Sequence, residues 1–172
     1  MNDEGTNRLV WVGTSSTVPS IDVTLDLRTH LTVWFGGLTP SVYWQLADPD
    51  FSLLEIGLER TSGRTTKVTV PLYRGGLGRR DAVHEGPNVE GIPEFDVRAW
   101  QPVARSTAGD FKEVSGRIRI DVERDGWWTI TMFDEAVVHH VGVRDLLSYG
   151  LNSRKELCQF SVNMARSHAS ES

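Results

Sequence analysis

The feature that most constrains this chain is the alternation of apolar and polar side chains within short segments. Every second residue from Ile21 to Leu27 is apolar, and the residues between them are polar. A period of two is typical of a β-strand that buries one face and exposes the other. The same parity continues over residues 31–35. We therefore expect either one long bent strand or a hairpin with a three-residue loop at residues 28–30.

The clearest hairpin is expected at Asp125-Gly126, between two alternating segments. A two-residue turn would place the apolar Ile120 opposite the polar Thr131. A shift of one residue places Val122 opposite Trp128, Ile120 opposite Ile130 and Ile118 opposite Met132, all on one face. Because burial sets the register of a strand pair, we predict a type I turn with a bulge, in which Gly126 is left-handed.

A second hairpin is expected around residues 62–64, which separate two further alternating segments. A three-residue loop there pairs Leu58 with Val68 and Ile56 with Val70. Loops one residue shorter or longer would place apolar residues opposite polar ones. Four further strands are expected, near residues 8–12, 94–100, 137–143 and 156–162.

Two short helices are expected, around residues 40–47 and 144–149. Thr39 can cap the first helix, Pro40 suits its first position, and Gly150 can end the second. The other segments are short strands with turn residues between them. We therefore predict a mainly β fold, either an antiparallel β-barrel or a β-sandwich.

Length and composition narrow the class of protein. The 172 residues suit one globular domain, which we expect to span residues 1–172 with frayed tails at 1–7 and 165–172. The single cysteine, Cys158, cannot form an internal disulfide. No apolar run approaches the roughly 20 residues that span a bilayer, and the first residues lack the features of a signal peptide. We expect a cytoplasmic protein that does not enter membranes.

The charge is unevenly distributed along the chain. The net charge is −5 overall, and it is −5 over residues 1–60, +3 over residues 61–120 and −3 over residues 121–172. An acidic chain has no general attraction to nucleic acid, so nucleic acid is not expected as a partner. The basic middle segment can still bind an anion locally.

A glycine-rich loop at residues 75–80 is the most distinctive part of that basic segment. Arg74, Arg79 and Arg80 are candidate binding residues there, because exposed backbone amides and guanidinium groups recognise anions. The loop lacks the Gly-Lys-Ser/Thr ending of a P-loop and the strand–loop–helix context of a dinucleotide site. We therefore predict no cofactor. The alternative is a flexible surface loop without a ligand.

Few residues form a recognisable catalytic pattern. There is no Gly-x-Ser-x-Gly sequence and no metal-ligand spacing, so no metal site is predicted. His139 and His140 are adjacent in a predicted strand and therefore point to opposite faces. If the protein is an enzyme, one of them would act as the acid or base together with Asp96 or Glu55. The alternative is a core histidine with a satisfied hydrogen bond. His84 can join such a site only through folding.

The outward face of the Asp125-Gly126 hairpin is the second candidate binding surface. Aromatic side chains beside arginine are typical of protein-binding hot spots, although another layer of the domain can also cover them. The candidate binding residues on this face are Trp127, Phe133, Arg117 and Arg119.

The absence of a catalytic pattern favours a non-enzymatic function. We predict a cytoplasmic protein-interaction module, similar in class to adaptor or immunity proteins, that binds a protein partner through the hairpin face and the Gly/Arg loop. The alternative is a small-molecule-binding β-barrel, or a small isomerase- or cyclase-like enzyme, that uses a cavity histidine. In that alternative Trp44, Trp100 and Trp128 line or fill a pocket for a small apolar ligand. The exposure of Trp127 and Phe133 tests the interaction-module prediction, which loses its main support if both side chains are buried inside the domain.

Overall fold

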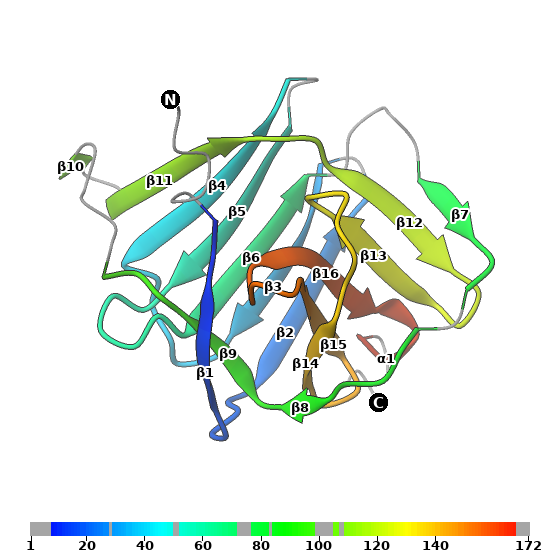
Figure 1. Cartoon of the computed structure of the whole chain (residues 1–172), viewed down its shortest axis with the longest axis horizontal. Helices are drawn as coiled ribbons and strands as arrows, with labels where there is room; N and C mark the ends of the chain where they lie inside the picture. The colour runs from blue at the N-terminus through cyan, green and yellow to red at the C-terminus, as the bar shows by residue number, and fades with distance from the viewer. Residues whose placement is uncertain are drawn as a thin grey trace.

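Two β-sheets packed face to face form most of the molecule (Figure 1). This arrangement confirms the mainly β prediction. Both sheets are open, so of the two predicted architectures the structure has the sandwich and not the barrel. No helix within the described ranges is long and apolar enough to cross a membrane. The computed structural model describes residues 8–27, 29–49, 52–71, 77–82, 84–98, 105–106 and 109–167.

The first sheet has seven strands in the order β10–β11–β4–β5–β6–β3–β2. Neighbouring strands are antiparallel except for β11 and β4, which are parallel. Its strands are β2 (Ile21–Asp26), β3 (His30–Phe35), β4 (Val42–Asp48), β5 (Ser52–Leu58), β6 (Thr65–Pro71), β10 (Arg105–Ser106) and β11 (Gly109–Ser115).

The second sheet also has seven strands, in the order β7–β12–β13–β16–β15–β14–β8. The short outer strands β7 and β8 run parallel to their neighbours, and the other pairs are antiparallel. Its strands are β7 (Gly78–Arg80), β8 (Val89–Glu90), β12 (Arg119–Glu123), β13 (Trp127–Thr131), β14 (His139–Val143), β15 (Leu147–Leu151) and β16 (Leu157–Asn163).

A two-stranded ribbon of β1 (Trp11–Ser15) and β9 (Ile92–Phe95) links the two sheets (Figure 1). The backbone amide of Phe95 donates to the carbonyl of Gly63 in the β5–β6 loop, at 2.9 Å. Just before the ribbon, the carbonyl of Leu9 accepts from the amide of Leu157 in β16, at 2.8 Å. The hydrophobic core lies between the inner faces of the sheets, where alternate strand residues meet.

The predicted register of the Asp125-Gly126 hairpin is confirmed. Ile120 lies opposite Ile130 in the β12–β13 pair, and Gly126 has a φ of 89°, in the left-handed region. The segment at residues 21–35 is also a hairpin, with Asp26 opposite His30. The turn therefore begins after Asp26 and ends before His30, one residue earlier than predicted, and residue 28 lies outside the described residues.

The register predicted for β5 and β6 is wrong, although the buried face is right. Ile56 lies opposite Val68, not opposite Val70, and a bulge follows Gly57. The turn is longer than three residues and is closed by its own hydrogen bond, from the amide of Glu59 to the carbonyl of Arg64 at 2.9 Å. A shift of two residues keeps every apolar side chain on the same face, so burial alone does not distinguish the two registers.

Both predicted helices are wrong. Residues 42–48 form β4, which lies between β11 and β5 in the first sheet and buries alternate side chains. Residues 147–151 form β15, and the turn before it contains Arg144 and Asp145 with φ of 49° and 40°. The described residues contain one short helix, α1 (Met164–Ser167), where a polar tail was expected. The predicted tail at 1–7 lies outside the described residues, as do residues 168–172 of the tail predicted at 165–172.

Candidate functional site

The outer face of the second sheet is polar, yet much of it is buried. Thr129, Ser148 and Ser161 are at most 2% exposed, and His140 is 8% exposed. Strand residues alternate between faces, and the neighbours of these residues in sequence point into the core. Polar side chains on an outward face are buried only if another part of the chain covers them. Two covering segments, residues 84–88 and 133–138, do this.

Each covering segment rests on a glycine of the sheet. A Cβ atom on Gly142 in β14 would lie 2.5 Å from a side-chain carbon of Pro87. A Cβ atom on Gly150 in β15 would lie 3.0 Å from a side-chain carbon of Val137. Because these positions carry no side chain, both segments can lie directly against the sheet.

A cleft of about 340 Å³ opens between the two covering segments. Thr131 in β13 and Gln159 in the neighbouring β16 line it from the sheet side, together with His140 in β14, which β15 separates from β16. His84 and Glu85 line it from one covering segment, and Asp134 and Glu135 from the other; Arg80, Arg119 and Glu123 also contribute. We call this the histidine cleft.

His84 is held over the sheet by several contacts. Its ring stacks on the indole of Trp127, with ring centroids 3.9 Å apart and planes 13° apart. Its backbone amide donates to the carboxylate of Asp125 at 3.0 Å. The side chain is only 6% exposed. Burial, with a smaller contribution from His140, lowers the pKa of His84 to about 4, so its imidazole is neutral near pH 7.

His140 lies beside His84, with the two ring centroids 5.9 Å apart at a steep angle. Its Nδ1 atom is 3.3 Å from the hydroxyl of Ser148, and its Nε2 atom is 3.6 Å from a carboxylate oxygen of Glu85. Burial lowers the pKa of His140, and Glu85 partly offsets this effect. The backbone of His140 exchanges two hydrogen bonds with Asn88, which attaches the covering segment to β14.

The carboxylate of Glu123 faces the imidazole of His84. Its Oε2 atom lies 3.7 Å from Nδ1 of His84, and its side chain is 4% exposed. Its Oε1 atom accepts a hydrogen bond from Thr129 at 2.7 Å, and the Thr129 hydroxyl is 3.1 Å from that of Ser161. Burial raises the pKa of Glu123, although the Thr129 hydrogen bond acts in the opposite direction. Burial thus disfavours charge on both members of the pair.

The arrangement does not have the geometry of a metal centre. Within the part of the chain that the structure describes, no group of three or more His, Cys, Asp or Glu side chains could hold a metal ion. The cleft instead offers two neutral imidazoles, a hydroxyl and an amide. These groups can donate and accept hydrogen bonds and can exchange protons with a ligand.

Of the two adjacent histidines, the structure places His140 in the cleft and His139 at an exposed position. The carboxylates predicted as their partners lie elsewhere. Glu55 is in the first sheet, where it pairs with Lys67 at 3.4 Å. Asp96 follows β9 and pairs with Arg98 at 3.1 Å. The carboxylates near the imidazoles are Glu85, Glu123 and Asp125, and no spacing in the sequence connects them to the two histidines.

The two aromatic residues of the hairpin face are both partly covered. Trp127 lies under the ring of His84. The guanidinium carbon of Arg8 lies 4.0 Å from the ring centroid of Phe133. Phe133 also makes an edge contact with Trp44, with ring centroids 6.4 Å apart. Trp44 itself is fully buried in the core, so it fills the interior and does not line an apolar pocket. Trp128 is partly buried against the same core, and Trp100 lies outside the described residues.

The arginines predicted as binding residues are divided between several hollows of the surface. Arg117 and Arg119 line a wider groove of about 910 Å³ that also contains Phe133. Arg79 and Arg80 line a hollow of about 580 Å³ beside β7. Arg74 lies outside the described residues. Arg80 of the Gly/Arg loop and Arg119 of the hairpin also line the histidine cleft, so the structure brings one arginine of each predicted surface to the same cleft, whereas Arg79 and Arg117 lie in separate hollows.

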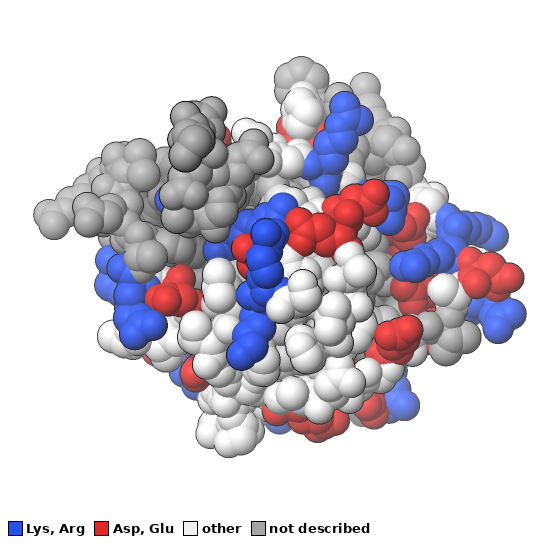
Figure 2. Space-filling model, viewed as in Figure 1, with Lys and Arg blue, Asp and Glu red and all other residues white. Residues whose placement is uncertain are grey.

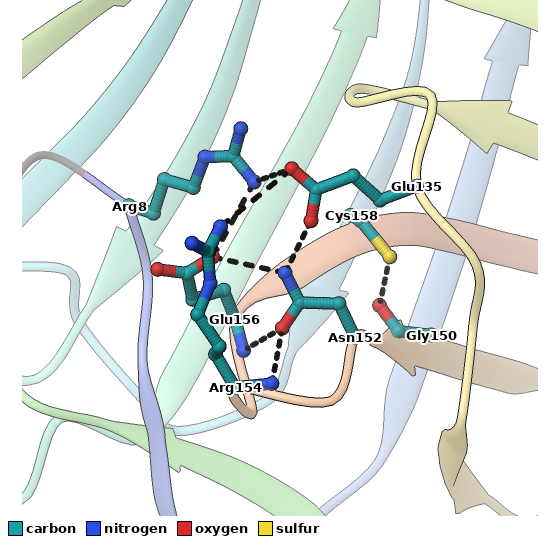
Figure 3. Close-up of polar contacts among 7 residues, drawn as sticks. All are labelled: Arg8, Glu135, Gly150, Asn152, Arg154, Glu156 and Cys158. Carbon is teal, nitrogen blue, oxygen red and sulfur yellow. Dashed lines mark hydrogen bonds and ion pairs between the residues drawn. The ribbon is translucent and has the colours of Figure 1, made fainter. Parts of the chain in front are cut away.

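A cluster of charged side chains holds the second covering segment in place (Figure 3). Arg8 forms ion pairs with Glu135 and, at 3.4 Å, with Glu156; Arg154 pairs with Glu156 at 2.9 Å. The amide of Asn152 donates to both carboxylates. These bonds lower the pKa of Glu135, so this wall of the cleft remains ionised. Figure 2, viewed as in Figure 1, shows acidic and basic side chains next to one another near the centre of the face that it presents.

Comparison with known proteins gives no relationship. No model of a known protein family matches the chain, and no curated protein is significantly similar to it in sequence. Function therefore has to be inferred from the geometry of the site.

Proposed function

We propose that this protein binds a small polar molecule in the histidine cleft. The observation that carries the proposal is the meeting of His84 and His140, from distant parts of the chain, in one cleft. Burial lowers the pKa of both imidazoles. Strongly shifted titratable groups that line a cleft are more common at functional sites than elsewhere.

Size and chemistry of the cleft support the same proposal. Its volume of about 340 Å³ lies within the range of roughly 300–1,000 Å³ that is usual for small-molecule sites. The side chains of Thr131 and Gln159 line it and form no hydrogen bond with another described residue. They are therefore available to a ligand that offers both donors and acceptors.

The protein-interaction module predicted from the sequence has less support. That prediction depended on exposed aromatic side chains at Trp127 and Phe133, and both are partly covered by other residues of the same chain. A small-molecule site is therefore the better proposal. We retain the cytoplasm as the proposed location. Cys158 is a free, buried thiol, which suits a reducing compartment.

The proposal can be tested with the imidazole NMR signals of the five histidines. A library of small polar metabolites is added to protein labelled with ¹³C-histidine. We expect a true ligand to shift the signals of His84 and His140 and to leave that of His139 unchanged. At a concentration one hundred times its Kd, such a ligand would add about 2.7 kcal/mol to the free energy of unfolding.

His139 provides a matched control, because it neighbours His140 in sequence but is exposed outside the cleft. His140→Phe should weaken binding at least about tenfold, since it removes a hydrogen-bonding group from a buried position. His139→Phe should leave binding unchanged. Equal binding by both variants would show that the cleft is not the site.

A further inference from the structure

We propose that the ligand of the histidine cleft carries a positive charge, in the form of a protonated amine. This inference rests on the function proposed above and adds to it the chemical class of the ligand. Two features of the cleft support it. Two buried hydrogen-bond acceptors lack a donor, and the unpaired charges of the lining are mainly negative.

The acceptors are Nε2 of His84 and Oε2 of Glu123. Both atoms are buried and have no hydrogen-bond partner among the described residues. Nδ1 of His84 lies 3.7 Å from Oε2 of Glu123. In the tautomer whose Nδ1–H faces this carboxylate, Nε2 carries the lone pair and is an acceptor. Leaving buried acceptors unpaired is unfavourable. Both residues line the cleft, so an amine bound there would bring N–H donors to the side chains that carry these acceptors.

Some charges of the cleft are already paired within the protein. Arg119 pairs with Asp121 at 2.9 Å, and Glu135 pairs with Arg8 and Arg154. These charges compensate one another and leave little net field for a ligand. They therefore do not decide which sign of charge the cleft prefers.

The remaining charges of the cleft lining do favour one sign. They are the carboxylates of Glu85, Glu123 and Asp134 and the guanidinium of Arg80. With both imidazoles neutral, negative groups exceed positive ones by two. A cation in the cleft would also favour the ionised form of Glu123, whose pKa is raised by burial. The lining is thus complementary to a cation and unfavourable for an anion.

The neighbouring groove limits the length of this cation. The groove adjoins the cleft, because Arg119, Thr131, Asp134 and Glu135 line both. The basic residues of its lining are Arg8, Arg117 and Arg119 and the acidic ones are Glu113, Asp134 and Glu135, so its positive and negative groups are equal in number. A second positive charge extending from the cleft would meet no excess of negative charge there. The cleft therefore suits a short amine with one charge better than an extended polyamine.

Three probes of one skeleton test the sign of the charge directly. Ethanolamine is a cation near pH 7, ethylene glycol is neutral and glycolate is an anion. Each is added to protein labelled with ¹³C-histidine, and the Kd is taken from the shifts of the His84 and His140 signals. We expect ethanolamine to bind at least about threefold more tightly than ethylene glycol, and glycolate to bind most weakly.

Variants of exposed carboxylates assign the effect to the cleft without disturbing the fold. Asp134→Asn and Glu85→Gln should each weaken ethanolamine binding about threefold and should weaken ethylene glycol binding less, because the diol is uncharged. Glu113→Gln is the matched control, because Glu113 is exposed and lines the groove but not the cleft. It should change neither affinity.

The outcomes separate this proposal from the function on which it rests. If ethylene glycol or glycolate shifts the two histidine signals at lower concentration than ethanolamine, the ligand is not a cation, but the cleft remains a binding site. If the carboxylate variants bind ethanolamine as tightly as the wild type, the charge preference does not come from the cleft. If none of the probes moves either histidine signal at high millimolar concentration, both proposals are wrong.

Discussion

Acidification should destabilise the protein through the buried imidazole of His84. Its pKa is about 4 in the folded protein, against 6.5 for an unperturbed histidine. The unfolded chain therefore takes up the proton first as the pH falls. The stabilisation is fully present above pH 6.5 and is lost progressively as the pH falls towards 4. At 1.36 kcal/mol per pH unit, this difference amounts to about 3 kcal/mol, a large part of the stability of an ordinary domain.

Urea denaturation at several pH values, for the wild type and for His84→Phe, measures this contribution. The phenyl ring can keep the stacking contact with Trp127 but cannot titrate. Titratable groups other than His84 affect both proteins, so their contributions largely cancel in the difference. We expect the stability advantage of the wild type over the variant to fall by about 3 kcal/mol between pH 7 and pH 4.

Glu123 is the neighbour most able to disturb this measurement, because it faces His84 at 3.7 Å. Its raised pKa acts in the opposite direction: the folded state gains stability relative to the unfolded chain as the pH falls. The same comparison in a Glu123→Gln background removes this effect. A difference between wild type and variant that stays constant with pH in both backgrounds would refute the reasoning.

Three further predictions concern stability and reactivity. Gly63→Ala should cost more than about 2 kcal/mol in urea denaturation, because φ is 71° and the new Cβ would lie 1.8 Å from the carbonyl oxygen of Phe95; an unchanged midpoint would contradict this. Asp48→Ala should cost about 1–3 kcal/mol, since it removes the acceptor 2.7 Å from the buried amide of Ile118; Asp48→Asn, which retains an oxygen, should cost less. Cys158, whose pKa burial raises to about 11, should react with iodoacetamide at least about a hundredfold more slowly than in the urea-unfolded chain, and equal rates would show an accessible thiolate.

Local pattern was a good guide wherever two strands are joined by a short turn. At Asp125-Gly126 the alternation on both sides and one glycine were enough to predict the bulged register. At Gly57 a bulge and a longer turn shifted the register by two residues, which changes no burial and leaves no trace in the alternation. Residues 40–47 combine a good helix start with an alternating pattern. They form a strand because β4 pairs with a strand on each side.

The candidate site was only partly predictable. The sequence indicated that adjacent histidines must face opposite sides of a strand, and the structure assigned His140 to the cleft. The sequence contained no sign that His84 would lie next to His140, because the two residues belong to segments that meet only after folding. The glycines at 142 and 150 share the outward face with His140 and are the only hint in the pattern that another segment lies close to this face.

The sequence by itself determined the mainly β architecture and the polar or apolar character of each strand face, because burial of alternate residues acts locally along the chain. Tertiary structure decided what covers the polar face of the second sheet. It brought His84 to His140 and Glu123, and it removed all three from water. The pKa shifts that make the cleft a candidate site arise from this desolvation, so they become visible only when distant segments are packed together.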